Sequence, residues 1–342
     1  MRPYVVLHNL DANIRGGAER DAIAARDSAE ASESVRVALS ALGPTEVVAT
    51  VDGDPTTLVP RLAALNPRVV FNLCEAARGV PELEAAVAGL LDLMGVAYTG
   101  NTPGTLALCL DKSRTKALLH GAGVPVPAGC VLRDAEKDPI KGVEYPVIVK
   151  PACMDASHGI EPANVVTTEK AARAKATELL DRFGGTVIVE DFVDGREINV
   201  TVADMGEGPV VFPLAEIDWK LPPHVPRVVG YDAKWVEGTE GYEGTPVICP
   251  ATLAPRTEQR VREVALAAFL AVSGRDYARV DVRLDQDERP FVLEVNPNPC
   301  LAETAGLARA AKAAGWSYDD FVRRIATNAE ARGPLAPLPR EG

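Results

Sequence analysis

The sequence predicts a mixed α/β (α+β) protein of two or three units. Residues 1–100 alternate strand-like and helix-like runs, as in an open α/β layer. Residues 186–330 carry several strands, including an acidic hairpin. The chain has 342 residues, 47% of them hydrophobic and 25% charged, which is typical of a globular protein and sufficient for more than one core.

The first unit, residues 1–100, is expected to be an open α/β layer. Its short apolar runs have the length of strands, and its longer runs have the spacing of helices. The expected elements are strands over Tyr4–Leu7, Thr45–Val51 and Val69–Leu73, and helices over Arg20–Leu42 and Glu82–Met94. No G-x-G-x-x-G motif follows the first strand, so a dehydrogenase-like dinucleotide fold has little support.

The second unit is expected over residues 101–185. A helix is predicted around Asp111–His120, and a strand over Tyr145–Lys150 leads into a polar loop. Glu169–Phe183 has the pattern of an amphipathic helix. The unit therefore combines strand and helix, as the first unit does.

The third unit is expected over residues 186–330. Its predicted elements are strands over Val187–Glu190, Glu197–Val202 and Val210–Leu214, an irregular loop over Asp218–Gly244, a helix over Thr257–Ser273 and the acidic hairpin. The tail, residues 331–342, is rich in proline and is expected to be disordered.

The hairpin within Ala278–Pro299 is the most informative segment. A turn centred on Asp287-Glu288 pairs Asp281 with Glu294 and Arg279 with Asn296. Two carboxylates that face each other repel, which is tolerable when a cation lies between them. Oxygen ligands without histidine or cysteine suit Mg²⁺ or Mn²⁺, and Arg279 suits an anion such as phosphate. A solvated hairpin with chance acids is the alternative.

Two further segments indicate a nucleotide. Lys150 ends an apolar strand and is followed by Asp155–Ile160, whose small residues let backbone N–H groups approach phosphate oxygens. The strand that ends at Glu190 runs into a linker whose backbone can bind an adenine edge, and Glu197 can bind ribose hydroxyls. A surface lysine and a plain hairpin are the alternatives.

Charge and composition limit the partners. The net charge is −12 and no basic run is present, so nucleic acid is not expected as a partner. The longest nearly apolar stretch, Ala85–Ala97, is too short to span a bilayer, so no membrane partner is expected. The cysteines have no metal-like or disulfide-like spacing, which favours a reducing, cytoplasmic location. The sequence is also compatible with a homodimer. The cysteines are Cys74, Cys109, Cys130, Cys153, Cys249 and Cys300.

A series of motifs resembles the ATP-grasp superfamily and, within it, the D-alanine–D-alanine ligases. The resemblance extends from about Val69 to Ile325 and is weaker in the N-terminal unit. The motifs are, in order, Asp111-Lys112-x-x-Thr115-Lys116, Val149-Lys150-Pro151, Glu190 with Gly195-Arg196-Glu197, Tyr231-Asp232-Ala233-Lys234, Cys249-Pro250-Ala251, Arg279-Val280-Asp281 and Glu294-Val295-Asn296-Pro297.

The resemblance implies a three-unit ATP-grasp fold with an N-terminal pre-ATP-grasp domain. ATP would lie between the central and C-terminal units. It also implies roles for individual residues. The phosphates of ATP would contact Lys112, Lys150, Ser157 and Lys234, adenine would be held by Glu190, Asp191, Phe192 and Val193, and ribose would be held by Glu197. Two Mg²⁺ ions would be held by Asp281, Glu294 and Asn296. Arg279 would stabilise negative charge near the attacking amine.

The implied reaction has two steps. A carboxylate attacks the γ-phosphate of ATP to give an acyl phosphate, and an amine then displaces phosphate to form an amide. Such a reaction needs positioning and charge neutralisation more than a protein nucleophile. The acyl phosphate must be shielded from water, and the Asp218–Gly244 loop is the candidate lid.

The amino-acid half of the site departs from the family's pattern. The family's N-terminal glutamate aligns with Arg26 or, less well, Asp27, and its phosphate-loop glycine and serine with Asp155 and Ala156. The tyrosine after the lid lysine is Trp235, and a serine for the second substrate's carboxylate is Ala305. These changes imply that ATP handling is retained and that the pocket for small amino acids or peptides is remodelled.

Three functions therefore compete. The first is a carboxylate–amine ligase of the D-alanine–D-alanine ligase type with a remodelled pocket. The second is an authentic cell-wall D-alanine–D-alanine ligase that uses substituted residues. The third is a catalytically silent nucleotide-binding interaction protein, which the complete set of lysine, arginine and acidic motif residues disfavours.

Overall fold

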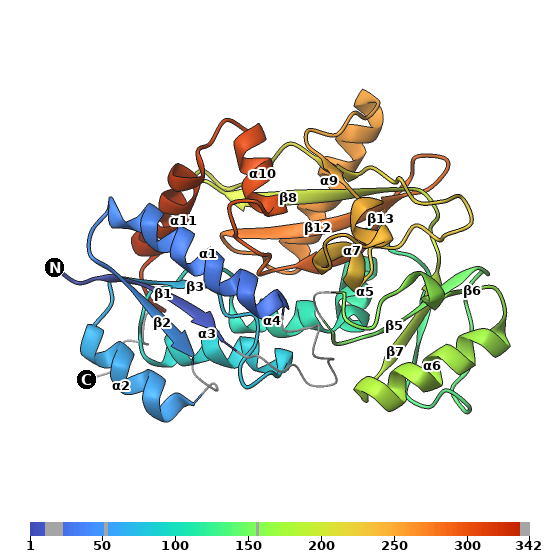
Figure 1. The fold of residues 1–342 in the computed structure, drawn as a ribbon, viewed down its shortest axis with the longest axis horizontal. Helices are drawn as coiled ribbons and strands as arrows, with labels where there is room; N and C mark the ends of the chain where they lie inside the picture. Colours follow the sequence, from blue (N-terminus) through green and yellow to red (C-terminus); the bar gives the residue numbers. More distant parts are fainter. Residues whose placement is uncertain (11–22, 51–53, 155–156, 336–342) are drawn as a thin grey trace.

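The structure is a computed structural model that describes residues 1–10, 23–50, 54–154 and 157–335. Three separate sheets with helices around them form a mixed α/β molecule, which confirms the predicted fold class (Figure 1). The N-terminal sheet and the larger C-terminal sheet lie side by side, and the smaller central sheet lies at the far end of the long axis. No helix of the described chain is long and apolar enough to cross a bilayer.

The N-terminal unit is the open α/β layer that the sequence predicts. Its three strands are parallel in the order β2-β1-β3, and every residue of β1 is buried, as its apolar first four residues favour. The predicted helix that starts at Arg20 begins, within the described residues, at Ile23. The elements are β1 (Tyr4–Asn9), α1 (Ile23–Ser40), β2 (Thr45–Thr50), α2 (Pro55–Leu65), β3 (Val69–Asn72) and α3 (Glu84–Leu93).

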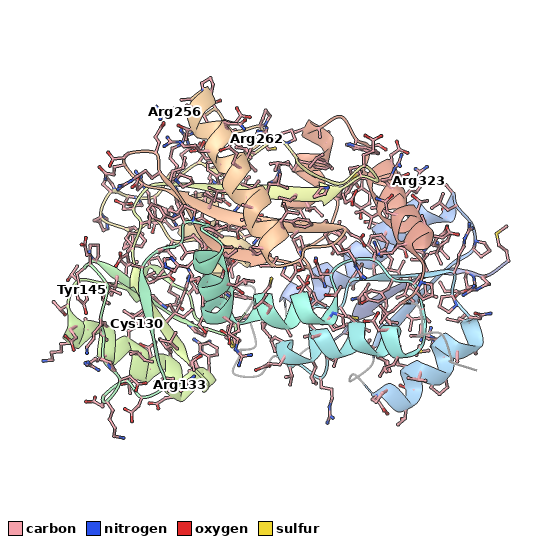
Figure 2. All side chains as sticks on the ribbon, turned by 180° about the vertical axis from the view of Figure 1, so that it is seen from behind. Cys130, Arg133, Tyr145, Arg256, Arg262 and Arg323 are labelled. Carbon is pink, nitrogen blue, oxygen red and sulfur yellow. The ribbon has the colours of Figure 1, made fainter. Side chains whose placement is uncertain are left out.

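The central sheet is antiparallel in the order β4-β7-β5-β6 and packs on one helix, α6. Leu132, Val149 and Leu179 lie in its separate hydrophobic core. Figure 2 shows Cys130, Arg133 and Tyr145 on this unit, with Tyr145 extending outward. The elements are β4 (Gly129–Leu132), β5 (Val147–Pro151), β6 (Val165–Val166), α6 (Glu169–Phe183) and β7 (Val187–Asp191).

Strand pairing favours a later boundary between the central and C-terminal units than residue 185. The strand β7 pairs with β4 and β5, so Val187–Asp191 belongs to the central sheet. Helices α4 (Pro103–Leu110) and α5 (Lys112–Gly121) instead contribute Cys109 and Leu119 to the core of the C-terminal sheet. The chain thus leaves and re-enters the C-terminal unit, a path that linear composition does not reveal.

The C-terminal sheet has six antiparallel strands and holds the acidic hairpin. Its main path is β11-β10-β8-β12-β13, and β9 pairs with β8. Helix α9 covers one face, where Val261, Ala265 and Phe269 pack on the strands. The elements are β8 (Arg196–Asp204), β9 (Pro209–Val211), β10 (Ala215–Ile217), β11 (Val247–Ile248), α9 (Pro255–Ala271), β12 (Tyr277–Leu284) and β13 (Pro290–Asn296).

The predicted hairpin register is confirmed. Asp281 pairs with Glu294, and Arg279 pairs with Asn296, across β12 and β13. The register shifts between Asp281 and Val282, which is a β-bulge beside the acidic pair. Bulges occur next to functional sites because they re-aim side chains locally.

The Asp218–Gly244 segment is not entirely irregular, which corrects the sequence expectation. It contains two short helices, α7 (Tyr231–Trp235) and α8 (Glu240–Glu243). Thr239 caps α8 by accepting a hydrogen bond from Tyr242 N at 3.2 Å. Such short helices, stabilised by one cap and by contact with each other, have too few residues to give a periodic signal.

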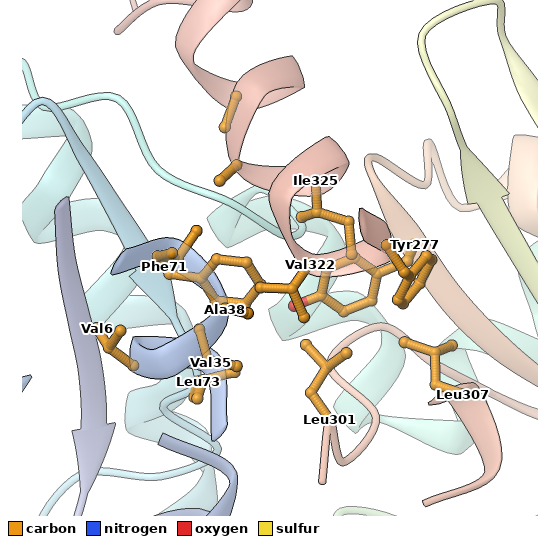
Figure 3. Packing of buried hydrophobic residues seen from close by; sticks show 14 of the residues in the cluster. Val6, Val35, Ala38, Phe71, Leu73, Tyr277, Leu301, Leu307, Val322 and Ile325 are labelled. Carbon is orange, nitrogen blue, oxygen red and sulfur yellow. The ribbon is translucent and has the colours of Figure 1, made fainter. Parts of the chain in front are cut away.

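The N-terminal and C-terminal units share one hydrophobic core. Figure 3 shows Val6 and Phe71 of the first sheet facing Val322 and Ile325, with Tyr277 of β12 on the other side. The last helices are α10 (Gly306–Ala313) and α11 (Tyr318–Arg332). Helix α11 extends to Arg332, two residues into the segment expected to be disordered; residues 336–342 lie outside the described chain.

Candidate active site

A cavity of about 640 Å³ is lined by residues from all three units. It contains every predicted site residue except Lys112, whose Nζ lies 3.4 Å from Glu294 Oε2 at the cavity wall. The structure therefore brings together residues that are up to 184 positions apart in the predicted set, from Lys112 to Asn296. The lining residues among them are Lys150, Ser157, Glu190, Asp191, Phe192, Val193, Glu197, Lys234, Arg279, Asp281, Glu294 and Asn296.

Asp281 is the best-satisfied carboxylate of the site. Arg279 donates to both of its oxygens, from Nε at 2.7 Å and from Nη2 at 2.8 Å. Asn199 and Asn296 donate to it at 2.9 and 3.0 Å. Burial alone would lower the pKa of Arg279, but the charge and hydrogen bonds of Asp281, together with the charges of Glu294 and Glu197, outweigh burial and raise it. This bidentate pair keeps the guanidinium charged.

Glu294 is also neutralised by the protein. Burial alone would raise its pKa, but the charges of Lys112, Lys234 and Lys150 hold it well below the ordinary range of a carboxyl group. The side-chain amide of Asn296 lies 3.3 Å from Glu294 and 3.0 Å from Asp281, so it joins the two carboxylates. The facing acids thus tolerate each other through the chain's own cations, and repulsion alone does not require a metal.

The donor set nevertheless fits a hard divalent cation. Asp281, Glu294 and Asn296 supply carboxylate and amide oxygens on one side of a hairpin that lines the cavity. Within the described residues, no group of three or more histidine, cysteine or acidic side chains is arranged for a metal. An ion held here would therefore need further ligands, such as water or the phosphates of a nucleotide.

A second buried cluster surrounds Glu190 on β7. Its Oε1 lies 2.7 Å from Lys150 Nζ, and its Oε2 lies 2.8 Å from Lys116 Nζ. Burial would raise the pKa of Glu190, but the two lysines outweigh burial and lower it. Burial lowers the pKa of Lys116 to about 8 although Glu190 opposes this. One carboxylate faces two cations, so the cluster has a net positive charge that suits an anionic ligand.

Glu197 on β8 is held by an arginine from the hairpin. Arg283 Nη2 donates to Glu197 Oε2 at 2.6 Å and to the carbonyl of Arg227 at 2.9 Å. Burial raises the pKa of Glu197 despite the charge of Arg283. The guanidinium also lies over the rings of Phe192 and Trp219. Glu197 is therefore oriented by a planar, stacked cation.

The candidate lid contacts the loop after β5. Tyr231 N donates to the carbonyl of Ile160 at 3.3 Å, and the rings of Tyr231 and His158 lie 5.0 Å apart. A Cβ at Gly230 would come within 2.6 Å of the Ile160 oxygen, so glycine permits this approach. Lys234 of α7 lines the cavity. Burial lowers its pKa, and the like charge of Arg279 lowers it further.

Sequence reasoning missed three partners in this site. Lys116 lies four residues after Lys112 on α5, so helical spacing places both on one face. Arg283 follows Arg279 and Asp281 at intervals of two residues along β12, so the sequence pattern places all three side chains on the same face of the strand. Asn199 on β8 carried no signal, because its role depends on pairing with Asp281 across the sheet.

Several residues on which the predicted remodelling of the amino-acid pocket depends lie outside the part of the chain that the structure describes. These are the segments with Asp155 and Ala156, and the side chains of Arg26, Asp27 and Trp235. Ala305 is described: it is the N-cap residue of α10 and lines the cavity without a hydrogen-bonding side chain.

Comparisons of this chain with known proteins agree on one family. A model of the D-Ala–D-Ala ligase C-terminus matches residues 118–327, more than half of the chain. The chain is 32% identical over 302 residues to a D-alanine–D-alanine ligase of Thermotoga sp. strain RQ2, covering 88% of this chain and 92% of the relative. It is also 32% identical over 265 residues to the uncharacterised protein y4sG of Sinorhizobium fredii, covering 77% and 75%.

Solved structures show the same fold. The D-alanine–D-alanine ligase of Bacillus anthracis complexed with ATP superposes with a TM-score of 0.71 at 19% identity, over 97% of this chain and 98% of that chain. The family model, the sequence relatives and the fold agree over the region that holds the cavity. The chain therefore belongs to the D-alanine–D-alanine ligase family of ATP-grasp proteins.

Proposed function

We propose that the protein is an ATP-dependent ligase that joins the carboxylate of one small amino acid or peptide to the amine of another. The reaction runs through an acyl phosphate and releases ADP and phosphate. The observation that carries the proposal is the single cavity in which lysines, arginines and the Asp281–Glu294 pair meet. Family membership supports the same reaction class.

The nucleotide end of the cavity is proposed to be the part near β5 and β7. The linker after β7, with Phe192 and Val193, presents backbone groups and an apolar ring to adenine. Glu197 is fixed by Arg283 and binds the ribose hydroxyls. Lys150 and Lys112 face the phosphates, and Ser157 at the loop adds a hydroxyl and a backbone N–H. The positive charge around Glu190 favours the triphosphate.

Asp281, Glu294 and Asn296 would hold Mg²⁺, in two ions if the family pattern applies. Bound there, Mg²⁺ neutralises phosphate charge and orients the γ-phosphoryl group. Lys234 approaches the γ-phosphate from the lid, and Arg279, held by Asp281, faces the negative charge that develops as the amine attacks. The lid and the loop after β5 exclude water from the acyl phosphate.

The amino-acid pocket is proposed to be remodelled relative to a typical family member. The lining near α10 has Ala305 where a carboxylate-binding serine is expected. The proposed location is the cytoplasm, where ATP is available.

A paired-substrate screen tests the function. Purified protein with ATP and Mg²⁺ is given D- and L-amino acids singly and in pairs, and released phosphate and product mass are measured. Phosphate and a coupled product should appear only when both the acid and the amine are present. No product from any pair, dipeptides included, would contradict the ligase function.

The runner-up is an authentic D-alanine–D-alanine ligase. The Thermotoga relative, a D-alanine–D-alanine ligase that is 32% identical over 88% of this chain, favours it. Rapid turnover with D-alanine alone would support this function. No turnover with D-alanine, together with turnover of another pair of substrates, would support a remodelled amino-acid pocket.

A further inference from the structure

We infer that Arg309 is the carboxylate-binding residue for the amine substrate, so that this substrate carries a free carboxylate. The inference rests on the proposed ligase function and specifies its second substrate. Arg309 lines the cavity on α10, together with Cys300, Ala305 and Gly306. It is half-buried there.

The position of Arg309 places it beside Ala305. The two residues are four apart at the start of α10, and Arg309 N donates to the carbonyl of Ala305 at 3.0 Å. Residues at this spacing share one face of a helix. The guanidinium folds back over this first turn, because its Nη2 donates to the carbonyl of Thr304 at 3.0 Å. The cation is therefore held at the part of the wall where Ala305 offers no donor.

Arg309 differs from the other arginines of the cavity lining in its partners. Within the described part of the chain, no carboxylate lies at ion-pair distance from it, and its contact with Thr304 is to a neutral carbonyl. The other two arginines of the cavity lining differ, since Arg279 is paired with Asp281 and Arg283 with Glu197. An arginine whose guanidinium has no acid at ion-pair distance retains donors in a planar fork that matches a carboxylate.

Its place along the lining indicates which substrate it meets. The chain runs from Asn296, in the proposed metal set, through residues 297–305 into α10, and most of this segment lines the cavity. The adenine-side residues belong to β7 and its linker on the central sheet. Arg309 therefore belongs to a different part of the lining from the adenine-side residues, and under the proposed function this part is assigned to the amine substrate.

The test compares each active amino acid with its primary carboxamide as amine substrate. The variants are Arg309→Met, Arg309→Lys and, as a matched control, Lys312→Met, which removes an exposed cation of the same helix outside the cavity lining. Arg309→Met should raise the KM of the free amino acid at least tenfold and change kcat less. The KM of ATP and the KM of the carboxamide should stay near those of the wild type. Arg309→Lys should recover part of the loss.

Two results would overturn the inference. One is a wild-type enzyme that uses the carboxamide as well as the free acid. The other is an Arg309→Met variant that loses both substrates equally, or no more than Lys312→Met does. A wild-type protein that releases no phosphate with any pair would instead refute the ligase function itself, and the assignment of Arg309 with it. Thermal melting of each variant separates these results from loss of folding.

Discussion

The environment of Glu190 differs from the one expected of an adenine-binding residue. The sequence predicts a carboxylate near adenine, and the structure places it between Lys116 and Lys150, buried from solvent. Because Lys116 also balances Glu190, Lys150 can turn toward a phosphate without leaving a buried carboxylate unpaired. Removing both cations would be costly, since a buried unpaired charge is strongly destabilising.

Lys116 gives a pH-dependent prediction. Its pKa falls from 10.5 to about 8 on folding, chiefly through burial. Between these pH values the unfolded chain holds a proton that the folded chain has released, so the free energy of unfolding rises with pH by at most about 1.4 kcal/mol per pH unit. Lys116→Met should lack this rise in urea unfolding at pH 8, 9 and 10. Lys170→Met, an exposed lysine on α6, is the control, and a parallel pH profile for Lys116→Met would contradict the prediction.

Asp281 gives a prediction for catalysis and stability. Asp281→Asn should lower kcat about 100- to 1,000-fold, because Asp281 holds Arg279, and would hold the proposed Mg²⁺, against the negative charge of the transition state. It should also lower the free energy of unfolding by about 3 kcal/mol, because Arg279 loses its bidentate partner.

Phosphate release and urea unfolding measure the two effects of Asp281→Asn. Asp287→Asn, at the exposed turn of the same hairpin, is the matched control. Near-normal turnover of Asp281→Asn would remove Asp281 from the proposed metal set.

At this scale, the sequence predicted residues that belong to contiguous motifs. Glu294 and Asn296 were identified because a hairpin fixes its register locally. The donors Asn199 and Lys116 depend on packing between separate elements, and no local pattern encodes that contact. Arg309 was not among the site residues predicted from the sequence, since its proposed role depends on the cavity.

Among the elements, the lid and the loop after β5 act as one surface. Gly230 brings the start of α7 to the Ile160 carbonyl, and a side chain there would separate the two segments. Gly230→Ala should therefore raise the KM of ATP several-fold and lower stability by about 1–3 kcal/mol through strain.

Gly121→Ala is the matched control for Gly230→Ala. An added Cβ at Gly121, in α5, meets nothing within 4 Å. Steady-state kinetics and thermal unfolding measure the effects. An unchanged KM in Gly230→Ala would separate the lid contact from nucleotide binding.

Long elements with clear periodicity were predictable, and short ones were not. The hairpin strands and α6 matched the sequence pattern because each is long enough for its periodicity to appear in the sequence. The two-residue strand β6 and the lid helices depend on tertiary contacts instead. Membership of β7 in the central sheet was also not predictable, since pairing between distant strands leaves no local trace.

At the level of the whole molecule, the shared core makes the first and third units one cooperative body. Phe321 of α11 is fully buried in this core together with Phe71 and Tyr277. Phe321→Ala should lower the free energy of unfolding by about 3–5 kcal/mol. Hydrogen exchange should quicken in β1 and β3 as well as in α11.

Leu179→Ala is the matched variant for the central unit. Leu179 lies in the separate core of the small sheet, so its exchange effect should stay within that unit. Faster exchange confined to α11 in Phe321→Ala would contradict a common cooperative body.

The shared core also has a consequence for synthesis on the ribosome. The first sheet is translated early, yet Val322 and Ile325, which cover part of it, lie near the end of the chain. The apolar face of the nascent N-terminal sheet therefore stays incomplete until α11 has also emerged from the ribosome. A stalled or prematurely terminated chain would expose that face, so chaperone demand should be highest just before α11 leaves the exit tunnel.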